Sequence, residues 1–232
     1  TNRYVFKKKV DGENNVAFKT RLAARGFTQE KGHDWFCNFA PTLALMSFRL
    51  LLALCSCCKL SIHNIDMVNA FLCGLMDCVV HMETPDYIWL LPKCRHLKNK
   101  RHTHCFEMKK AIHGLMQSAH LFNKRFVEVL LQLGFQQMTS DPCLFMMKRG
   151  QRIIIIAIHV DDTIIACKSP QDLQWAMKMM AKSFKFKNLG TLKCILGLHV
   201  GRSNGAYWIN QEKCILRMAE KCNVHAGKRA KT

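Results

Sequence analysis

The stretch "AIHVDDTIIA" (residues 157–166) places two adjacent aspartates, Asp161 and Asp162, beside one of the most apolar parts of the chain. Five of the six residues from Ile153 to Ile158 are isoleucine, and such a run predicts a buried β-strand. Two carboxylates about 4 Å apart repel each other by roughly 4 kcal/mol at an effective dielectric constant near 20, and burial adds a desolvation cost. We therefore expect the pair at the tip of a hairpin, where side chains reach solvent.

The aspartate pair has two interpretations. Asp is a common turn residue, so the pair can be an ordinary turn between two strands. Alternatively it belongs to a divalent-metal site, because Mg²⁺ prefers oxygen ligands and two ions about 3.5–4 Å apart stabilise the attacking and leaving oxygens of phosphoryl transfer. Such a site needs a carboxylate from a neighbouring strand, and Asp66 in "NIDMVNAF", at the end of another apolar strand, is the candidate.

The rest of the chain supplies strands and helices around these aspartates. In the first half of the chain we expect strands over 4–10 and 16–22, a buried helix over 47–60, a strand over 62–72 and an irregular loop over 81–105. A helix over 118–134 follows, then three strands joined by turns at 149–150 and 161–162. The chain continues with a helix over 170–186, two strands joined by a turn at 204–205, and a final helix. This order predicts an α+β fold whose antiparallel sheet is a split βαβ unit with helices on one face.

The composition indicates a polyanionic partner. Lys and Arg total 35 against 16 acidic residues, which gives a formal net charge of +19. Nucleic acid is the first candidate and an anionic membrane surface the second. No apolar run approaches the roughly 20 residues that span a bilayer, and "TNRYVFKKKV" at the start lacks a signal-peptide core, so we expect an intracellular protein without membrane attachment. Because the first residue is Thr, we expect a piece of a longer protein.

The thirteen cysteines lack the regular spacing of a secreted disulfide framework. Most lie in apolar contexts, so we expect reduced thiols that act as small core residues. Zinc is the alternative, from "HTHC" (102–105) with Cys94 and His96, or from Cys55 and Cys58 in a C-x-x-C pattern. The first group lacks a complete second ligand pair and the second falls inside an apolar helix, so core packing is preferred.

Ordered motifs run along the whole chain: "FKTRLAARGFTQEKGHDWFCNFAPT", "NIDMVNAFLCG", "KKAIHGLMQSAHLF", "LGF" with "SDPCLF", "HVDD", "FKFKNLGTLKCILGLHV" and "INQEKCI". Together they resemble the reverse transcriptase of copia-type LTR retrotransposons. Asp66, Asp161 and Asp162 match the family's three catalytic, metal-binding carboxylates. The resemblance implies addition of dNTPs to a primer 3′-hydroxyl on an RNA or DNA template, with two Mg²⁺ ions, or Mn²⁺ as the alternative ion.

The resemblance also implies roles in substrate binding. Phe71 matches the aromatic residue under the incoming sugar, which would clash with a 2′-hydroxyl, and Gln117 matches a glutamine near the nucleotide. The other expected positions are Arg25, Lys19 and Arg21 at the triphosphate, and His159, Val160, Leu196 and Gly197 at the primer. The chain departs from the family pattern at His159, where Tyr is usual, and at His113, Met116, Ala119 and His120. Lost positive charge there would weaken template or nucleotide binding.

The resemblance implies one reverse transcriptase domain over residues 1–232. The fingers would be 1–46 and 80–112, the palm 47–79 and 113–202, and the start of the thumb or connection 203–232. In the parent Pol polyprotein, protease and integrase would precede this domain and RNase H would follow it, inside a cytoplasmic virus-like particle. The alternative is a catalytically decayed remnant that keeps the fold and binds nucleic acid without polymerising.

Overall fold

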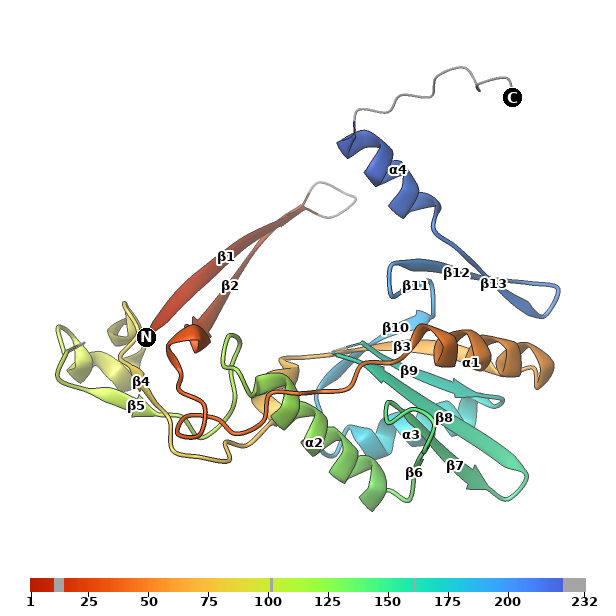
Figure 1. The fold of residues 1–232 in the computed structure, drawn as a ribbon, viewed down its shortest axis with the longest axis horizontal. Helices are drawn as coiled ribbons and strands as arrows, with labels where there is room; N and C mark the ends of the chain where they lie inside the picture. Colours follow the sequence, from red (N-terminus) through yellow and green to blue (C-terminus); the bar gives the residue numbers. More distant parts are fainter. Residues whose placement is uncertain (11–14, 101, 161, 223–232) are drawn as a thin grey trace. The chain divides into compact units, whose positions relative to one another are not determined.

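The computed structural model describes residues 1–10, 15–100, 102–160 and 162–222 (Figure 1). The chain divides into two compact units. Unit 1 comprises Thr1–Pro41 and Asn69–Val129, and unit 2 comprises Thr42–Val68 and Leu130–Thr232. Among the described residues, no helix combines the length and the apolar character that crossing a membrane requires.

Unit 1 is built from a long hairpin and several short elements. Strands β1 (Asn2–Val10) and β2 (Val16–Ala24) pair antiparallel from Asn2↔Ala24 to Val10↔Val16. The remaining elements are η1 (Gly26–Thr28), η2 (Ala70–Cys73), β4 (His81–Glu83), η3 (Ile88–Leu90), η4 (Pro92–Leu97), β5 (Cys105–Glu107) and most of α2 (Ser118–Gln132). The expectation of an irregular loop over 81–105 was therefore incomplete, because β4 and β5 pair there and enclose two 3₁₀ turns.

The base of the hairpin is fastened to the rest of unit 1. The Asn2 side chain donates a hydrogen bond to the Glu83 carbonyl at 2.7 Å, and the Tyr4 hydroxyl donates one to the Asp86 carbonyl at 2.8 Å. At the other strand, the backbone N–H of Gly26 donates to Gly114 at 2.9 Å. A Cβ on Gly26 would lie only 2.1 Å from the Gly114 oxygen, so this close backbone approach requires glycine.

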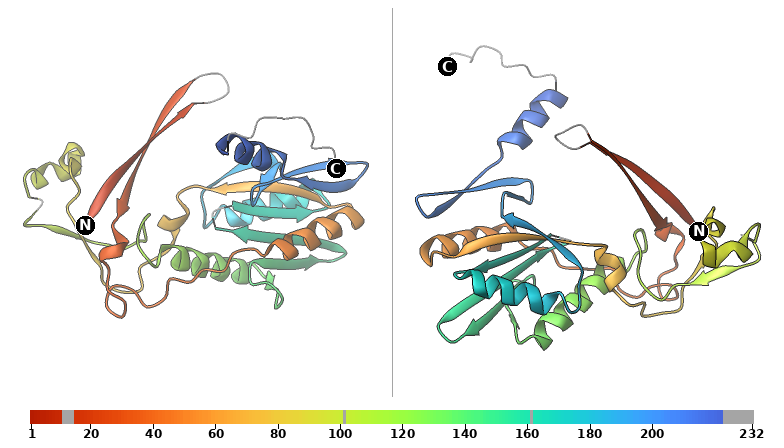
Figure 2. Two further views of the ribbon diagram at one scale, coloured as in Figure 1. Left: turned by 45° about the horizontal axis from the view of Figure 1, so that its top comes forward. Right: turned by 180° about the vertical axis from the view of Figure 1, so that it is seen from behind.

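Unit 2 contains a six-stranded antiparallel sheet of order β10-β3-β9-β8-β7-β6. The strands are β10 (Phe186–Thr191), β3 (Ser61–Met67), β9 (Asp162–Cys167), β8 (Arg152–His159), β7 (Leu144–Arg149) and β6 (Gln136–Gln137). The isoleucine run is a buried strand, as predicted, and residues 154–158 of β8 are buried consecutively. Since neighbouring side chains point to opposite faces, both faces of the sheet are covered there. Helix α3 (Pro170–Met180) lies against one face, as the view from behind shows (Figure 2).

A small second sheet completes unit 2. Strands β11 (Cys194–Ile195), β12 (Leu198–Ser203) and β13 (Ala206–Asn210) pair antiparallel and precede α4 (Glu212–Lys221). The predicted turn at 204–205 is confirmed, with Asn204 and Gly205 both at positive φ between paired Ser203 and Ala206. The hydroxyl of Tyr207 on β13 accepts a hydrogen bond from the Ile62 N–H at 3.0 Å, which ties this sheet to β3.

Asp141 fixes the start of α1 (Leu45–Cys57) in unit 2. It is 3% exposed, and its carboxylate accepts hydrogen bonds from the N–H groups of Ala44 at 3.1 Å and Cys143 at 2.8 Å. Ala44 is the N-cap of α1 and has no capping side chain of its own. The carboxylate therefore supplies, from a distant part of the sequence, the acceptor that a helix N-terminus needs.

The predicted antiparallel sheet is confirmed, and the fold is mixed α/β with few helices. Several predicted bounds were wrong by a few residues. The strand expected over 62–72 ends at Met67, because Asn69 has φ of +54° and a 3₁₀ turn follows. Among the cysteines, which are free thiols, Cys55 is buried, and burial raises its thiol pKa to about 12. Cys57 and Cys58, expected in the core, are exposed at the end of α1.

Candidate active site

Asp66 and Asp162 are direct partners across the sheet. Asp66 is the penultimate residue of β3, Asp162 is the first residue of β9, and the antiparallel register pairs the two positions. Directly opposed residues point to the same face, with Cβ atoms typically about 4.5–5.5 Å apart. Both residues are partly exposed. Asp161, the third predicted carboxylate, lies outside the described residues, so its place in the site stays a prediction.

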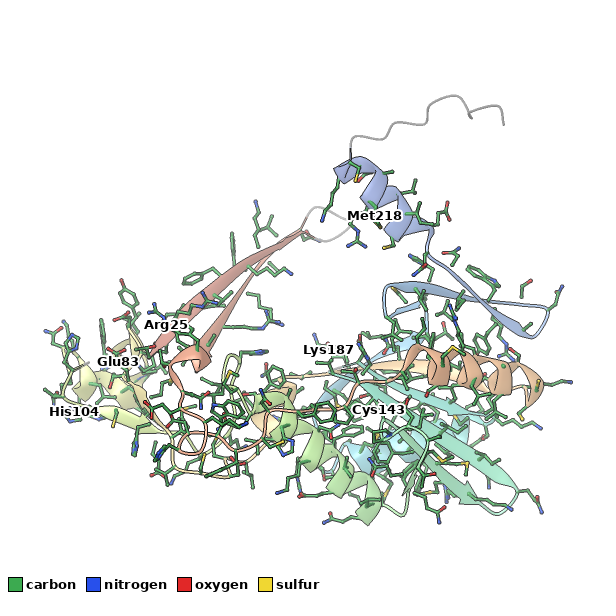
Figure 3. All side chains as sticks on the ribbon, in the orientation of Figure 1. Arg25, Glu83, His104, Cys143, Lys187 and Met218 are labelled. Carbon is green, nitrogen blue, oxygen red and sulfur yellow. The ribbon has the colours of Figure 1, made fainter. Side chains whose placement is uncertain are left out.

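The two carboxylates form the middle of a row that crosses four adjacent strands. Lys187 on β10 is opposite Asp66, and His159 on β8 is opposite Asp162. We call these four residues the carboxylate row. Lys187, labelled in Figure 3, is exposed on the edge strand. His159 is partly buried, and its Nδ1 atom is buried without a hydrogen-bond partner among the described residues. A cation and an imidazole therefore flank the carboxylate pair.

The chemistry of this row fits a hard divalent cation. Two carboxylates on one face offer oxygen ligands, which Mg²⁺ prefers. Asn64 lies two residues before Asp66 on the same face of β3, and its buried Oδ1 has no hydrogen-bond partner among the described residues. A further oxygen acceptor is thus placed beside the carboxylates. Asp66, Asp162 and Asn64 are the described groups that could hold a metal or the water bound to it.

The backbone is strained next to this row. Val160 follows His159 and has φ of +58°, in the left-handed region that β-branched side chains rarely adopt. Conformations of this kind cost of order 1–3 kcal/mol and cluster at functional sites. Val160 is 41% exposed. The predicted primer-positioning pair, His159 and Val160, therefore lies where β8 ends, directly beside the carboxylates.

The second pair predicted at the primer, Leu196 and Gly197, forms a hairpin turn between β11 and β12. Ile195 pairs with Leu198, and the two intervening residues have φ of +54° and +74°. Positive φ at both central positions is the type I′ pattern, which matches the twist of a hairpin. Gly197 suits that conformation, whereas Leu196 adopts it at a steric cost. Their contact with a primer stays a prediction.

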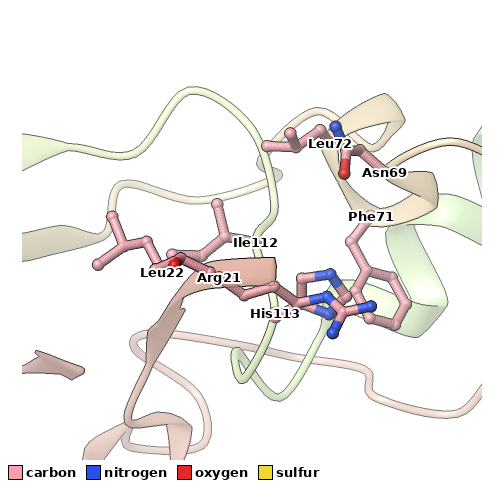
Figure 4. Close-up of a pocket in the computed structure, with 8 residues that line it drawn as sticks. Arg21, Leu22, Asn69, Phe71, Leu72, Ile112 and His113 are labelled. Atoms are coloured by element: carbon pink, nitrogen blue, oxygen red, sulfur yellow. The ribbon is translucent and has the colours of Figure 1, made fainter. Parts of the chain in front are cut away.

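Phe71 lines a cavity within unit 1 of about 280 Å³. The other lining residues include Arg21 and Leu22 of β2, Asn69, Ile112 and His113 (Figure 4). The Phe71 and His113 rings meet edge to face with centroids 4.9 Å apart, which is a favourable aromatic geometry. A flat apolar wall and the Arg21 guanidinium thus share one cavity, and such a site can bind a sugar and an anion together.

Arg25 and Lys19 lie apart from this cavity. Arg25 lines a separate cavity of about 120 Å³ together with Gln29, Asp34 and His81. Lys19 pairs with Lys7 across the hairpin. Of the three predicted triphosphate cations, the structure places only Arg21 on the wall that carries Phe71.

Gln117 is fully buried and its amide is engaged inside unit 1. Its Nε2 donates to the Asp34 carbonyl at 2.7 Å, and its Oε1 accepts from the Gln29 amide at 3.1 Å. The Gln29 oxygen in turn accepts from the Met116 N–H at 2.8 Å. This chain of bonds holds the segment after η1 against the start of α2. Contact between Gln117 and a nucleotide stays a prediction.

Sequence reasoning missed Lys187, Asn64 and the packing partner His113. Lys187 could have been found from "FKFKNLG", since alternation in that strand places a cation on the face opposite Phe186. Its position beside Asp66 depends on the register of β10 with β3, which the sequence does not specify. His113 was noted only as a departure from the family pattern.

Comparison with known proteins identifies the family of the chain. The family described as reverse transcriptase (RNA-dependent DNA polymerase) matches residues 1–232. The chain is 30% identical over 234 residues to a retrovirus-related Pol polyprotein from transposon TNT 1-94 of Nicotiana tabacum, covering 99% of this chain and 17% of that protein. It is 27% identical over 227 residues to such polyproteins from transposons RE1 and RE2 of Arabidopsis thaliana, covering 97% of this chain and 15% of each. The chain thus spans less than a fifth of the length of these relatives, and it belongs to the reverse transcriptase (RNA-dependent DNA polymerase) family.

Proposed function

We propose that the chain is the RNA-directed DNA polymerase domain of a copia-type retrotransposon Pol polyprotein. The observation that carries the proposal is the direct pairing of Asp66 with Asp162 at adjacent strand ends. The family supplies the reaction, in which a primer 3′-hydroxyl attacks the α-phosphate of a dNTP and pyrophosphate leaves. Other Pol domains and a virus-like particle are the expected context.

The carboxylate row would hold the divalent cations. Asp66 and Asp162, together with Asp161, would bind two Mg²⁺ ions, which when bound activate the hydroxyl and neutralise charge on the leaving group. Lys187 beside Asp66 would offset part of the repulsion between the two carboxylates. The strained turn at Val160 would hold Asp162 at the strand end.

The cavity of unit 1 would select the nucleotide. Phe71 would lie under the sugar and clash with a 2′-hydroxyl, and Arg21 would contact phosphate oxygens. His113 would support the Phe71 ring from its edge. This assignment moves the triphosphate role from Arg25 toward Arg21. The fingers would lie mainly in unit 1 and the palm mainly in unit 2. Residues 203–232 would be the start of the thumb or connection.

Primer extension tests the proposal. The purified chain, given Mg²⁺, dNTPs and a primer on an RNA or a DNA template, should extend the primer, and Asp162→Asn should reduce extension at least a hundredfold. Glu128→Gln is the matched control, because it removes an exposed carboxylate of α2 that forms an ion pair with Arg125 at the surface. Extension that survives Asp162→Asn would contradict the assignment of the site.

A remnant that binds nucleic acid without polymerising is the second candidate. Two positions where the family has cations carry Met116 and His120, and the His120 Nδ1 lies 2.8 Å from the Phe39 carbonyl. That contact uses the His120 Nδ1 atom within the protein, so this atom is not open to a nucleic-acid phosphate. The remnant predicts salt-sensitive binding of RNA or DNA with no Mg²⁺-dependent incorporation in the extension assay.

A further inference from the structure

The connection between β4 and β5 in unit 1 forms a lobe that is fixed at its base. We call its described residues, 84–100 and 102–104, the β4–β5 lobe. The Thr84 hydroxyl donates a hydrogen bond to the carbonyl of His104 at 2.7 Å, which closes the lobe beside the paired strands (His104 is labelled in Figure 3). Leu97, the last residue of η4, is buried. The lobe therefore has a defined conformation in which its other side chains are held.

Large apolar side chains are exposed together at the start of the lobe. Tyr87 is 62% exposed, Leu90 73% and Leu91 54%. Hydrogen bonds of 3.0 Å from the Leu90 N–H to the Tyr87 carbonyl and from the Leu91 N–H to the Ile88 carbonyl hold the turn that presents them. Trp89 is partly buried, and its ring contacts Tyr87 with centroids 5.5 Å apart. A group of apolar side chains left in solvent in this way indicates a binding surface.

The remainder of the lobe is strongly cationic. The sequence has no acidic residue between Asp86 and Glu107. Four exposed cations follow the apolar group: Lys93, Arg95, Lys98 and Lys100. Their summed field attracts an anionic partner to the side of the lobe that continues from the apolar group. A partner for this surface must therefore offer negative charge next to an apolar region.

An anionic lipid bilayer meets both requirements better than nucleic acid or protein does. Nucleic acid offers phosphates, but the aliphatic side chains of Leu90 and Leu91 have no ring on which a base can stack. A stable protein–protein interface buries about 1,200–2,000 Å², and one apolar group of three exposed side chains is too small to form its core. A bilayer surface attracts the cations to its lipid phosphates and accepts leucine, tyrosine and tryptophan at the boundary between headgroups and acyl chains.

We infer that the β4–β5 lobe binds the surface of an anionic lipid bilayer. Leu90 and Leu91 enter the boundary of the acyl chains, Tyr87 lies at the level of the headgroups, and the four cations contact lipid phosphates. Adsorption of this kind needs no apolar run of spanning length, but it differs from the expectation that the chain has no membrane attachment. It involves neither the carboxylate row nor the cavity of Phe71.

Flotation with lipid vesicles in EDTA tests the inference, since it separates bound protein from aggregates. The purified chain should float with vesicles of phosphatidylcholine and phosphatidylserine but not with vesicles of phosphatidylcholine alone. Leu90→Ala and Leu91→Ala should each raise Kd for the anionic vesicles about tenfold, because each removes three carbon atoms from an inserted side chain. Leu90→Trp should bind at least as tightly as the wild type. Leu75→Ala is the matched control, since Leu75 is 64% exposed in unit 1 outside the lobe, and should leave Kd unchanged.

Substitution of the cations tests the contribution of charge. Lys98→Gln and Lys100→Gln should each raise Kd for the anionic vesicles about fivefold, the effect of one lysine near an anionic surface. Added salt should weaken binding of the wild type. Lys124→Gln, which removes an exposed cation of α2 outside the lobe, should leave Kd unchanged. Equal flotation with both kinds of vesicle would overturn the inference.

Two comparisons separate this inference from nucleic-acid binding and from the polymerase proposal. Fluorescence anisotropy with a labelled single-stranded oligonucleotide should give the same Kd for Leu90→Ala and Leu91→Ala as for the wild type. Loss of oligonucleotide binding in these variants, with vesicle binding unchanged, would overturn the inference and assign the lobe to nucleic acid. Asp162→Asn should float with anionic vesicles as the wild type does, even if primer extension fails. A chain that extends primers but does not float with anionic vesicles would remove the inference alone.

Discussion

Asp66 and Asp162 face each other directly across β3 and β9, and neither carboxylate is fully exposed. Like charges in directly opposed positions destabilise a sheet. Lys187, at one end of the carboxylate row, offsets part of that repulsion from the neighbouring strand. The proposed divalent cation would bind between the two carboxylates, so the stability of the chain should depend on it.

Removing one charge of the pair should stabilise the chain when divalent cations are absent. Asp162→Asn keeps the shape of the side chain but ends the repulsion, so we expect a gain of about 0.2–1 kcal/mol, or up to roughly 4 °C in Tm. In Mg²⁺ the wild type should have the higher Tm of the two, because the ion stabilises only the wild-type site. Thermal unfolding in EDTA and in Mg²⁺ measures both effects. A wild-type Tm that does not respond to Mg²⁺ would argue against the metal site.

Phe71 should control the choice between deoxyribonucleotides and ribonucleotides. Phe71→Ala opens the cavity wall beside His113 and should raise the ratio of rNTP to dNTP incorporation at least tenfold, with extension from dNTPs largely kept. Single-nucleotide incorporation kinetics measures this ratio. Leu72→Ala is the control, because it shortens another lining side chain of the same cavity without removing the ring. An equal rise in the ratio of rNTP to dNTP incorporation in Phe71→Ala and Leu72→Ala would contradict a specific steric role for Phe71.

The sequence predicted the parts of the fold that depend on local pattern. The isoleucine run, the hairpin turns with glycine and the helix that begins at Pro170 follow from side-chain periodicity and turn chemistry. Ser169 caps this helix, because its hydroxyl accepts a hydrogen bond from the Gln171 N–H at 3.1 Å. The expectation that Asp66 lies on a strand near the aspartate pair came from its position at the end of an apolar strand, and the family motifs agree with it. The register that places Lys187 and His159 beside them depends on long-range pairing, which local pattern does not determine.

Side-chain environment was harder to predict than element type. Gln117 resembles a surface residue in the sequence, yet two segments of unit 1, one with Gln29 and Asp34 and the other with Cys78, converge on its buried amide. Arg21 and Arg25 are four residues apart and look equivalent. Arg21 lies within β2 and Arg25 follows the strand at the start of a 3₁₀ turn, so the two guanidiniums line different cavities.

Relieving the strain at Val160 should raise the stability of the chain and lower its activity. Val160→Asn places a residue that tolerates positive φ at this position, so we expect about 1 kcal/mol of added stability, or roughly 2–4 °C in Tm. Primer extension should fall if the valine side chain positions the primer. Val16→Asn, at an exposed strand position, is the control and should give no gain in Tm. A Tm for Val160→Asn below that of the wild type would contradict strain at this turn.

Asp141 should make the chain lose stability in acid. Burial alone would raise the pKa of this carboxyl, but hydrogen bonds from Ser47 and from the N–H groups of Cys143 and Ala44 hold its pKa below the ordinary value of 3.8. A carboxyl whose pKa is lower in the folded state stabilises the fold fully above its ordinary pKa, and this contribution is lost as pH falls through the folded pKa. The loss should therefore begin below about pH 5 and deepen below pH 4.

Replacing Asp141 tests this assignment through the pH dependence of unfolding by urea. Asp141→Asn keeps an oxygen acceptor for the Ala44 N–H but has no charge, so it should lower the free energy of unfolding at pH 7 by about 1–2 kcal/mol and flatten its decline below pH 5. Glu128→Gln, an exposed carboxylate with 47% side-chain exposure, should leave both quantities unchanged. An Asp141→Asn variant that loses stability in acid as steeply as the wild type would show that other carboxylates cause the acid response. A flatter dependence of the unfolding free energy on pH would instead show that Asp141, which caps α1 from 97 positions away, causes the acid response.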